Sequence, residues 1–459
     1  MFEKESDSET KINETEKDME SEITREQAKE LLEFIEKKWD DFIFDAKNAP
    51  KDSDNPDDIL YLPEKYVVPN DKKFDTMFYW DSYFIIQGLK TEKNRQDLIK
   101  GVVNNCLYEI ETYGKVLNAN KKKWSTRSQL PYLAPMIEDV YPLANIKSSK
   151  NGKGKKDSLR NFSNQKSENI GMGVYEESCD KEWLAKAFDL VKKEYNEYWM
   201  DASHLTSTGL SRFYDESGDE PIGDYKKPHT YKSRAEASWD MSPRFDDSDI
   251  HDLLPIDLNC NLYQYEKEFE KFALKLGNKE EAEDWNKKAE ARKKAINDLM
   301  WNEEDGLYYD YNYKTGEQKK IKSLAAYQAM FTRLASQEQA EKLKNNLKLF
   351  KVKGGLAACD KDYGYQDRQW NYPIIWAPLQ YAAAKGMENY GYKKEAEKIK
   401  KDFVKLVCEN WERTGKIWEK YDGQEGSGEK VPFDRYPPQS GFGWTNAVAE
   451  VFIKERYRI

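Results

Sequence analysis

Histidine and cysteine are scarce in this chain, and neither residue type is spaced for chemistry. Among 459 residues there are three histidines, His204, His229 and His251, and no HExxH pattern, which argues against a histidine-based metal site or catalytic triad. The five cysteines are scattered and include no CxxC pair, so the sequence predicts neither a disulfide framework nor a zinc site. Phosphate-binding patterns of the GxxxxGK[ST] and GxGxxG types are absent as well. No metal and no cofactor is therefore expected.

An apolar leader and an excess of positive charge are also missing. The opening residues, MFEKESDSETKINETEKDMESEI, contain no stretch of the kind that a signal peptide or a membrane helix requires. The protein is therefore expected to be cytoplasmic and to have no membrane partner. Lys plus Arg number 74 against 84 Asp plus Glu, which gives a net charge of −10. This balance argues against nucleic acid as a partner, because such binding needs a cationic surface.

Two polar stretches interrupt the chain. Residues 1–22 are acidic and almost free of apolar side chains, so they cannot offset the entropy lost on ordering and are predicted to form a disordered tail. Residues 146–171 are rich in Lys, Ser, Asn and Gly, which predicts a polar surface insertion. A basic nucleic-acid arm is the alternative, disfavoured because Phe162 is the one aromatic residue there. The remainder, 23–459, is predicted to be a single domain.

Aromatic residues are abundant, with 13 Trp, 30 Tyr and 19 Phe. Their flat apolar faces suit a pyranose ring, but large core and interface side chains account for the same composition. At the level of composition both interpretations stay open.

Amphipathic helices dominate the pattern of the sequence. One is predicted to begin at Thr24, where Gln27 completes a capping box, and similar helices recur with Gly, Asp, Asn or Pro between them. Strand-like alternation is confined to short pieces such as GLYYDYNY at 306–313. Roughly ten to twelve helices in hairpins indicate an all-α toroid or solenoid. The closed (α/α)6 toroid is favoured, because the unusual residues lie between helices, where the loops of a ring converge.

Short motifs in these connections combine aromatic residues with charges or amides. Burying Asp or Arg beside Trp is costly unless the charge is paired or binds a ligand, so the mixture indicates a polar pocket with aromatic walls. Capped helix ends with ordinary ion pairs are the alternative for any single motif. The motifs are WDSYF (Trp80–Phe84), RSQ (Arg127–Gln129), SWD ahead of Ser242 and Arg244, PIDLN (Pro255–Asn259), QW and WAPLQ within Gln369–Gln380, EKYD (Glu419–Asp422) and QSGFGWTN (Gln439–Asn446).

In this order, from about Phe74 to Tyr457, the motifs resemble those of the trehalases, glycoside hydrolase family 37. The resemblance leaves out the tail and the 146–171 insertion. It implies an (α/α)6 toroid that hydrolyses α,α-trehalose to two glucose molecules with inversion.

The resemblance places the general acid at Asp240 and the general base at Glu419. An acetal link needs a proton on its leaving oxygen and an attacking water on the opposite face, and one carboxyl group serves each side. Trp239 and nearby aromatic rings are expected to keep Asp240 protonated, and Lys420 to favour the anion of Glu419. Competing candidates are Asp246 and Asp247 for the acid and Glu425 and Glu429 for the base, each of them interpreted as a solvated loop charge.

The resemblance also implies sugar contacts, and it shows departures. Trp80 and Trp370 are expected to wall the sugar ring, whereas the remaining contacts hold hydroxyl groups. For Arg127 the alternative is an ion pair with a helix-end carboxylate. The contacts fall on Trp80, Asp81, Asn120, Arg127, Ser128, Gln129 and Trp370, and the departures on Lys73, Lys227, His229, Ser238, Asn371 and Arg435.

The departures change binding groups and spare both predicted catalytic carboxyls. Lys cannot reproduce the bidentate fork of an Arg, and Arg435 stands where the family pattern has a Glu. A related toroidal hydrolase is therefore the first alternative, acting on another α-glucoside or α-mannoside with an anionic aglycone, such as glucosylglycerate or mannosylglycerate. A non-catalytic sugar-binding helical protein is the second. The predicted partner is a small α-glycoside, and no oligomeric state is predicted.

Overall fold

The computed structural model describes residues 22–70, 73–141, 181–215, 233–245, 250–365, 368–432 and 436–459. The predicted disordered tail, apart from Glu22, and the predicted insertion at 146–171 lie outside the described residues. Both stay predictions. The described helices include none that is long and apolar enough to span a bilayer.

The first described helix shows how local sequence sets an element. Helix α2 spans Arg25–Lys38. Its capping box is formed as predicted. The backbone amide of Gln27 donates to Thr24 Oγ1 at 3.2 Å, and the backbone amide of Thr24 donates to Gln27 Oε1 at 2.9 Å. Its apolar stripe, including Leu31 and Ile35, is buried against the rest of the protein.

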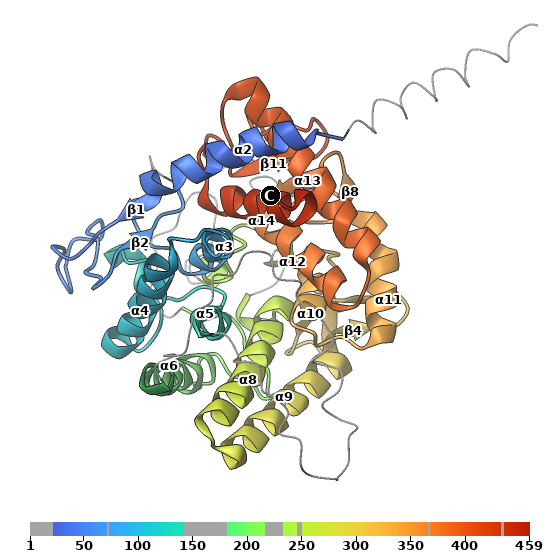
Figure 1. Cartoon of the computed structure of the whole chain (residues 1–459). Coiled ribbons are helices and arrows are strands. Elements are labelled where there is room, and N and C mark those ends of the chain that lie inside the picture. The colour runs from blue at the N-terminus through green and yellow to red at the C-terminus, as the bar shows by residue number, and fades with distance from the viewer. Residues whose placement is uncertain are drawn as a thin grey trace, which may run out of the picture.

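Within the described part of the chain, six helices form an inner ring. Each contacts the next, and the last closes on the first, so that they surround the middle of the molecule in Figure 1. These helices have few exposed positions, which fits their apolar sequences. They are α3 (Tyr79–Leu89), α5 (Leu133–Val140), α8 (Ile256–Leu276), α10 (Gln328–Phe331), α12 (Ala377–Asn389) and α14 (Gly443–Tyr457).

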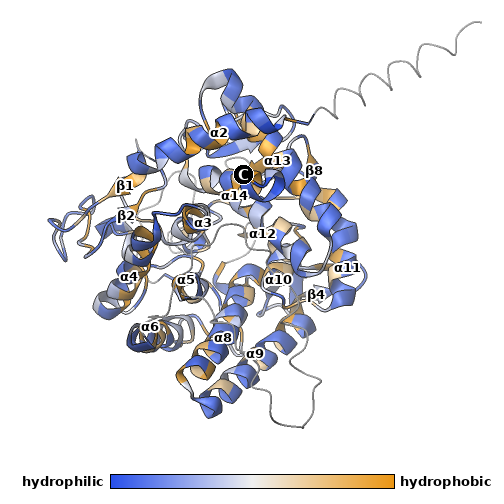
Figure 2. Cartoon of the chain, viewed as in Figure 1, coloured by the Kyte–Doolittle hydropathy of each residue, from blue (hydrophilic) through white to orange (hydrophobic). Residues whose placement is uncertain are grey.

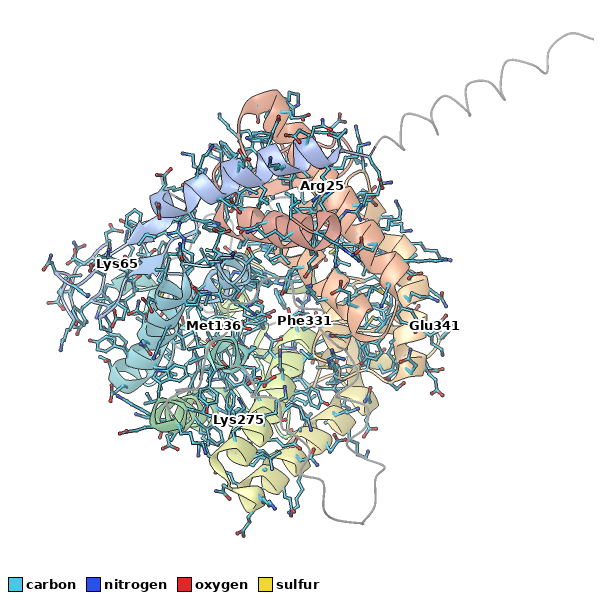
Figure 3. All side chains as sticks on the ribbon, viewed as in Figure 1. Arg25, Lys65, Met136, Lys275, Phe331 and Glu341 are labelled. Atoms are coloured by element: carbon cyan, nitrogen blue, oxygen red, sulfur yellow. The ribbon has the colours of Figure 1, made fainter. Side chains whose placement is uncertain are left out.

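The outer helices are amphipathic and pack on the inner ones. Figure 2 shows their outward faces as hydrophilic, and Figure 3 places Arg25 and Glu341 at the rim, with Met136 and Phe331 nearer the centre. Besides α2, they are α4 (Gln96–Tyr113), α6 (Lys181–Glu194), α9 (Lys279–Met300), α11 (Gln337–Asn346) and α13 (Lys393–Thr414). Alternating inner and outer helices make the predicted (α/α)6 toroid, and the prediction is confirmed.

Closure of the ring depends on a close approach between α3 and α14. A Cβ at Gly88 would lie 2.6 Å from the Cα of Ala447, far inside normal contact distance. Glycine is therefore required where these helices cross.

Short antiparallel strands at one end connect the helices. β10 (Ile374–Trp376) pairs with β11 (Lys420–Asp422), with Trp376 opposite Lys420, so the start of the WAPLQ motif lies beside the EKYD motif. The predicted strand at 306–313 is present as β5 (Leu307–Tyr308) and β6 (Asp310–Asn312). The other strands are β1 (Ile43–Phe44), β2 (Tyr66–Val67), β3 (Leu253–Leu254), β4 (Trp301–Asn302), β7 (Glu317–Lys319), β8 (Lys351–Val352) and β9 (Gly355–Leu356).

Candidate active site

Tryptophans from four separate segments meet at one end of the ring. Trp239 stacks on Trp370 with ring centroids 5.2 Å apart, and Trp370 stacks on Trp376 at 3.9 Å. Trp80, in the first turn of α3, lies 5.6 Å from Trp370 and 5.7 Å from Trp444, in the first turn of α14. The motifs that carry these residues therefore build one continuous aromatic wall.

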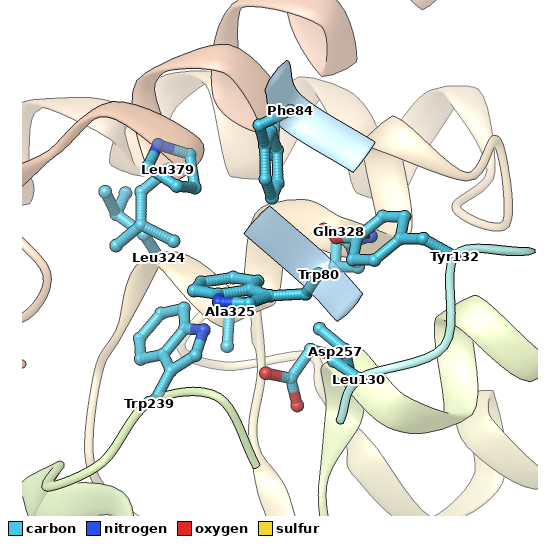
Figure 4. Close-up of a pocket in the computed structure, with 12 residues that line it drawn as sticks. Trp80, Phe84, Leu130, Tyr132, Trp239, Asp257, Leu324, Ala325, Gln328 and Leu379 are labelled. Carbon is cyan, nitrogen blue, oxygen red and sulfur yellow. Dashed lines mark hydrogen bonds between the residues drawn. The ribbon is translucent and has the colours of Figure 1, made fainter. Parts of the chain in front are cut away.

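A small cavity lies against this wall. Trp80 and Trp239 line it together with Leu130 and Tyr132, as the close-up in Figure 4 shows. Its volume of about 10 Å³ has room for no more than one water molecule. The cavity is too small for a sugar, and neither Asp240 nor Glu419 lines it.

Three predicted site carboxyls, distant in sequence, are brought together. Asp81 is buried in the first turn of α3. Burial raises the pKa of Asp81 well above its usual range, and the nearby charges of Glu419 and Asp240 raise it further. The ring thus places Glu419 and Asp240 within electrostatic reach of Asp81.

Both carboxylate oxygens of Glu419 have a side-chain partner. The Tyr436 hydroxyl donates to Oε1 at 2.6 Å, and Lys420 Nζ lies 3.3 Å from Oε2. The backbone is fixed as well, because Trp444 Nε1 donates to the Glu419 carbonyl at 3.0 Å. The side chain is almost fully buried. The cation predicted beside this carboxylate is present, in the form of Lys420.

Asp240 is partly buried and follows the stacked Trp239. Gln369 donates from Nε2 to the Asp240 carbonyl at 2.6 Å and accepts from Lys420 Nζ at 3.0 Å. Because Lys420 also pairs with Glu419, Gln369 links the backbone at one predicted catalytic residue to the partner of the other.

A buried cation packs against the ring of Trp239, the residue before Asp240. Arg244 is fully buried, and its guanidinium lies 4.8 Å from the centre of the Trp239 ring. It donates to Asp257 at 2.7 and 2.8 Å and to Asp310 at 2.8 Å. Burial opposes its charge, but the two carboxylates outweigh burial and raise the pKa of Arg244. The guanidinium, paired with both carboxylates, therefore supports the Trp239 ring.

Residues of the RSQ motif lie beside α3. Gln129 Oε1 accepts from the Trp80 amide at 3.0 Å. Arg127 is nearly buried, with one nitrogen 3.9 Å from Asp215, so the ion-pair alternative for Arg127 is partly realised. Its Nε and the Nε1 of Trp370 are buried with no hydrogen-bond partner in the described part of the chain.

Asn120 and Ser128 are fully buried and have hydrogen-bond contacts within the protein. Asn120 is fully buried, accepts from the Met77 amide at 2.7 Å and donates to the Leu60 carbonyl at 3.0 Å. These contacts brace the loop that precedes α3. Ser128 is also fully buried, and its hydroxyl lies 3.4 Å from the Gln129 carbonyl. Their predicted contacts with a ligand stay predictions.

Ser238 adopts a backbone conformation that favours glycine. Its φ is +64°, in the left-handed region, which fits the Gly that the family pattern has at this position. Its hydroxyl accepts from the Leu130 amide at 3.1 Å, an interaction that a glycine could not make.

The remaining candidates divide between described and undescribed residues. Lys73 is exposed, and its Nζ lies 3.9 Å from the centre of the Tyr436 ring. Glu425 is exposed and Glu429 pairs with Arg413 at the surface, as expected for solvated loop charges. Lys227, His229 and Arg435, and the competing acids Asp246 and Asp247, lie outside the described residues.

Several residues of the site were not singled out from the sequence. Trp376 and Trp444 were included only as parts of longer motifs, and Tyr436 was not named. Asp310 did leave a signal, as a lone acid between tyrosines in a predicted strand. A buried partner such as Arg244 is what that pattern required.

Comparison with known proteins gives concordant results. The profile of the trehalase family matches residues 1–456. The periplasmic trehalase of Salmonella newport (strain SL254) is 31% identical over 460 residues, covering 91% of this chain and 72% of that protein. The periplasmic trehalase of Escherichia coli O8 (strain IAI1) is 30% identical, covering 91% and 73%.

Solved structures show the same fold. The neutral trehalase of Saccharomyces cerevisiae superposes with a TM-score of 0.74 at 23% identity, covering 94% of each chain. A mannosylglycerate hydrolase of family GH63 from Thermus thermophilus superposes with a TM-score of 0.59 at 17% identity, covering 84% of this chain and 95% of the other.

One expectation is corrected by these relatives. The sequence predicted a cytoplasmic protein from its polar opening residues. That prediction is wrong, because the curated relatives that match nine-tenths of the chain are named as periplasmic enzymes.

Proposed function

The chain belongs to the trehalase family, and from this premise we propose that it hydrolyses α,α-trehalose by inversion, with Asp240 as general acid and Glu419 as general base. The observation that carries the proposal is the convergence of Asp240 and Glu419 on the buried Asp81 beside one aromatic wall.

Each carboxyl group has one task. Asp240 gives its proton to the glycosidic oxygen, so that the leaving glucose departs as a neutral alcohol. Glu419 takes a proton from a water that attacks the anomeric carbon from the opposite face. Inversion needs room for that water, which corresponds to roughly 6.5–9.5 Å between the two carboxyl groups.

The surroundings of Glu419 suit a base. Lys420 and the Tyr436 hydroxyl both stabilise the anion, and the anion is the form that accepts a proton. Gln369 holds Lys420 in place from the acid side, which fixes the direction in which the base faces.

Asp81 acts as a hydrogen-bond donor in this proposal. Burial, and next to it the charges of Glu419 and Asp240, raise the pKa of Asp81. These surroundings favour its neutral form, which can donate to a sugar hydroxyl and avoids a second negative charge beside Glu419.

The aromatic wall binds the sugar face. Trp80 and Trp370 offer apolar area to the ring. Arg127 Nε and Trp370 Nε1, which have no hydrogen-bond partner among the described residues, are donors for sugar oxygens. Burying such donors without a ligand is costly, so binding a polyhydroxylated molecule is favourable.

A second candidate substrate has an anionic aglycone. The observation that favours it is Lys73, whose ammonium group lies over the ring of Tyr436, the residue that holds the base. An α-glucoside or α-mannoside of glycerate would place a carboxylate near this cation. Both substrates use the same acid and base.

Proton NMR of the first turnovers tests the proposal. With trehalose, inversion gives equal early amounts of α- and β-glucose, whereas retention gives only the α-anomer. Parallel reactions with glucosylglycerate and mannosylglycerate decide between the two substrate classes. No hydrolysis of any of the three would contradict the proposed function.

A further inference from the structure

A carboxylate outside the proposed catalytic pair lies four residues before Asp240. Glu236 ends a helical turn at 233–236 and is fully buried. Its Oε1 accepts from the Ser128 amide at 3.2 Å and from the Tyr198 hydroxyl. Its Oε2 accepts from the Tyr214 amide at 2.9 Å. Both oxygens are thus occupied by donors from segments distant in the chain, so Glu236 is not itself placed to protonate a substrate.

Further contacts join the loop that contains Ser128 to the segment that contains Glu236. The Leu130 amide donates to Ser238 Oγ at 3.1 Å. The side-chain amide of Asn118 donates to the Ser128 carbonyl at 3.1 Å and reaches the Ala235 carbonyl at 3.5 Å. The binding loop 127–130 and the acid segment 235–240 are therefore connected at three successive points, and Glu236 is the charged one.

A buried histidine lies beside Glu236. His204 Nε2 lies 3.4 Å from Glu236 Oε2, and His204 Nδ1 lies 3.0 Å from Asp201 Oδ1. Burial lowers the pKa of His204, but these two carboxylates outweigh burial and raise it to about 9. A charged acceptor forms stronger hydrogen bonds with its donors than a neutral one.

We propose that Glu236 is a positioning residue, which fixes Asp240 relative to the loop that binds the sugar and so aligns the proton donor with the glycosidic oxygen. The inference rests on the proposed role of Asp240. Proton donation requires the acid within hydrogen-bond reach of the leaving oxygen, and a displacement of about 1 Å can cost roughly a hundredfold in rate.

The choice of leaving group separates positioning from general damage. The glucose leaving group of trehalose needs a proton, whereas fluoride leaves as a stable anion without one. In both reactions water attacks the anomeric carbon and Glu419 takes its proton. α-Glucosyl fluoride therefore reports on the base and on the folded fraction, but depends little on the alignment of Asp240.

The experiment compares kcat for trehalose and for α-glucosyl fluoride in Glu236→Gln. The amide replaces one acceptor oxygen by a donor, which conflicts with the N–H and O–H groups around it. We expect kcat for trehalose to fall about a hundredfold and kcat for the fluoride to fall less than about tenfold, with little change in KM. Equal losses on both substrates would overturn the inference. If the Gln variant does not fold, Glu236→Asp takes its place, because it keeps the carboxylate and shortens the side chain. This variant should show the same selectivity for the fluoride, and equal losses on both substrates would again overturn the inference.

Two controls make the outcome specific. Glu266→Gln removes another fully buried carboxylate, which pairs with Arg292 at 2.8 Å away from the wall, and should leave the ratio of the two activities unchanged. Asp240→Asn should show the strongest selectivity for the fluoride. If Asp240→Asn is selective and Glu236→Gln is not, only the inference fails. If Asp240→Asn is not selective, the proposed function itself fails.

Discussion

The proposed base and the proposed acid are surrounded by different described contacts, some made to a carboxylate and others to a backbone carbonyl and a ring. Tyr436 and Lys420 both contact the side chain of Glu419. Around Asp240, by contrast, Gln369 holds the backbone carbonyl and Arg244 supports the ring of Trp239.

These contacts suit the two proposed tasks. A base must be anionic before the reaction, so cations and donors on its oxygens help it. An acid must deliver its proton within hydrogen-bond reach of the leaving oxygen, so the frame around it must be fixed. Variants on the two sides should therefore fail in different ways.

The largest effect is expected from removing either carboxylate. Asp240→Asn and Glu419→Gln should each lower kcat for trehalose by about 10⁴-fold or more, because proton transfer is lost. Both variants should keep the wild-type melting temperature and circular dichroism. Steady-state kinetics on purified protein measures this, and a wild-type rate in either variant would remove that residue from the mechanism.

Breaking the buried frame on the acid side should cost stability. Asp310→Asn leaves Arg244 with one of its two carboxylates, and loss of a partner from a buried ion pair costs about 3–5 kcal/mol. Urea unfolding measures the free energy. The matched control is Asp298→Asn, from an exposed pair with Lys294, where a change within about 0.5 kcal/mol is expected. Equal changes in both variants would show that Arg244 does not support the segment.

The acid side also contains a titrating cation. Since the pKa of His204 is raised to about 9 in the folded protein, its stabilising contribution is complete below about pH 6.5 and is lost as the pH rises through 9. Between these limits the wild type should lose on the order of 3 kcal/mol more unfolding free energy than His204→Gln. Denaturant titrations over this pH range measure it, and parallel curves would contradict the assigned charge.

A smaller effect is expected from removing one hydrogen bond to the proposed base. Tyr436→Phe removes one hydrogen bond to the Glu419 carboxylate, worth about 1.5–3 kcal/mol for a charged acceptor. The value of kcat/KM for trehalose should fall, because the carboxylate loses a donor that holds one of its oxygens. Steady-state kinetics measures it, and an unchanged kcat/KM would mean that this hydroxyl does not support the base.

Local features were predictable from the sequence because their causes are local. The capping box at Thr24 needs two residues three positions apart, and the short strands around Asp310 follow alternation within eight letters. Family motifs led to Asp240 and Glu419 and, because it is adjacent, to Lys420, but not to the contacts made by Gln369 and Tyr436.

Long-range partners were not predictable, since nothing in the sequence pairs distant residues. Arg244 pairs with Asp310 across 66 positions, and Tyr436 contacts Glu419 across 17. Nothing in the sequence distinguishes Glu236 from other acidic residues, whereas the fold surrounds it with donors from residues 128, 198 and 214.

The most direct test of the division between acid and base is rescue by a small nucleophile. In Glu419→Ala the shortened side chain leaves room for azide, which needs no base and can attack the anomeric carbon of α-glucosyl fluoride on the face where water would have attacked. The account predicts that azide restores turnover in this variant, with β-glucosyl azide as the product seen by NMR, and gives no rescue in Asp240→Ala. Formation of the α-azide, or rescue of Asp240→Ala in place of Glu419→Ala, would contradict it.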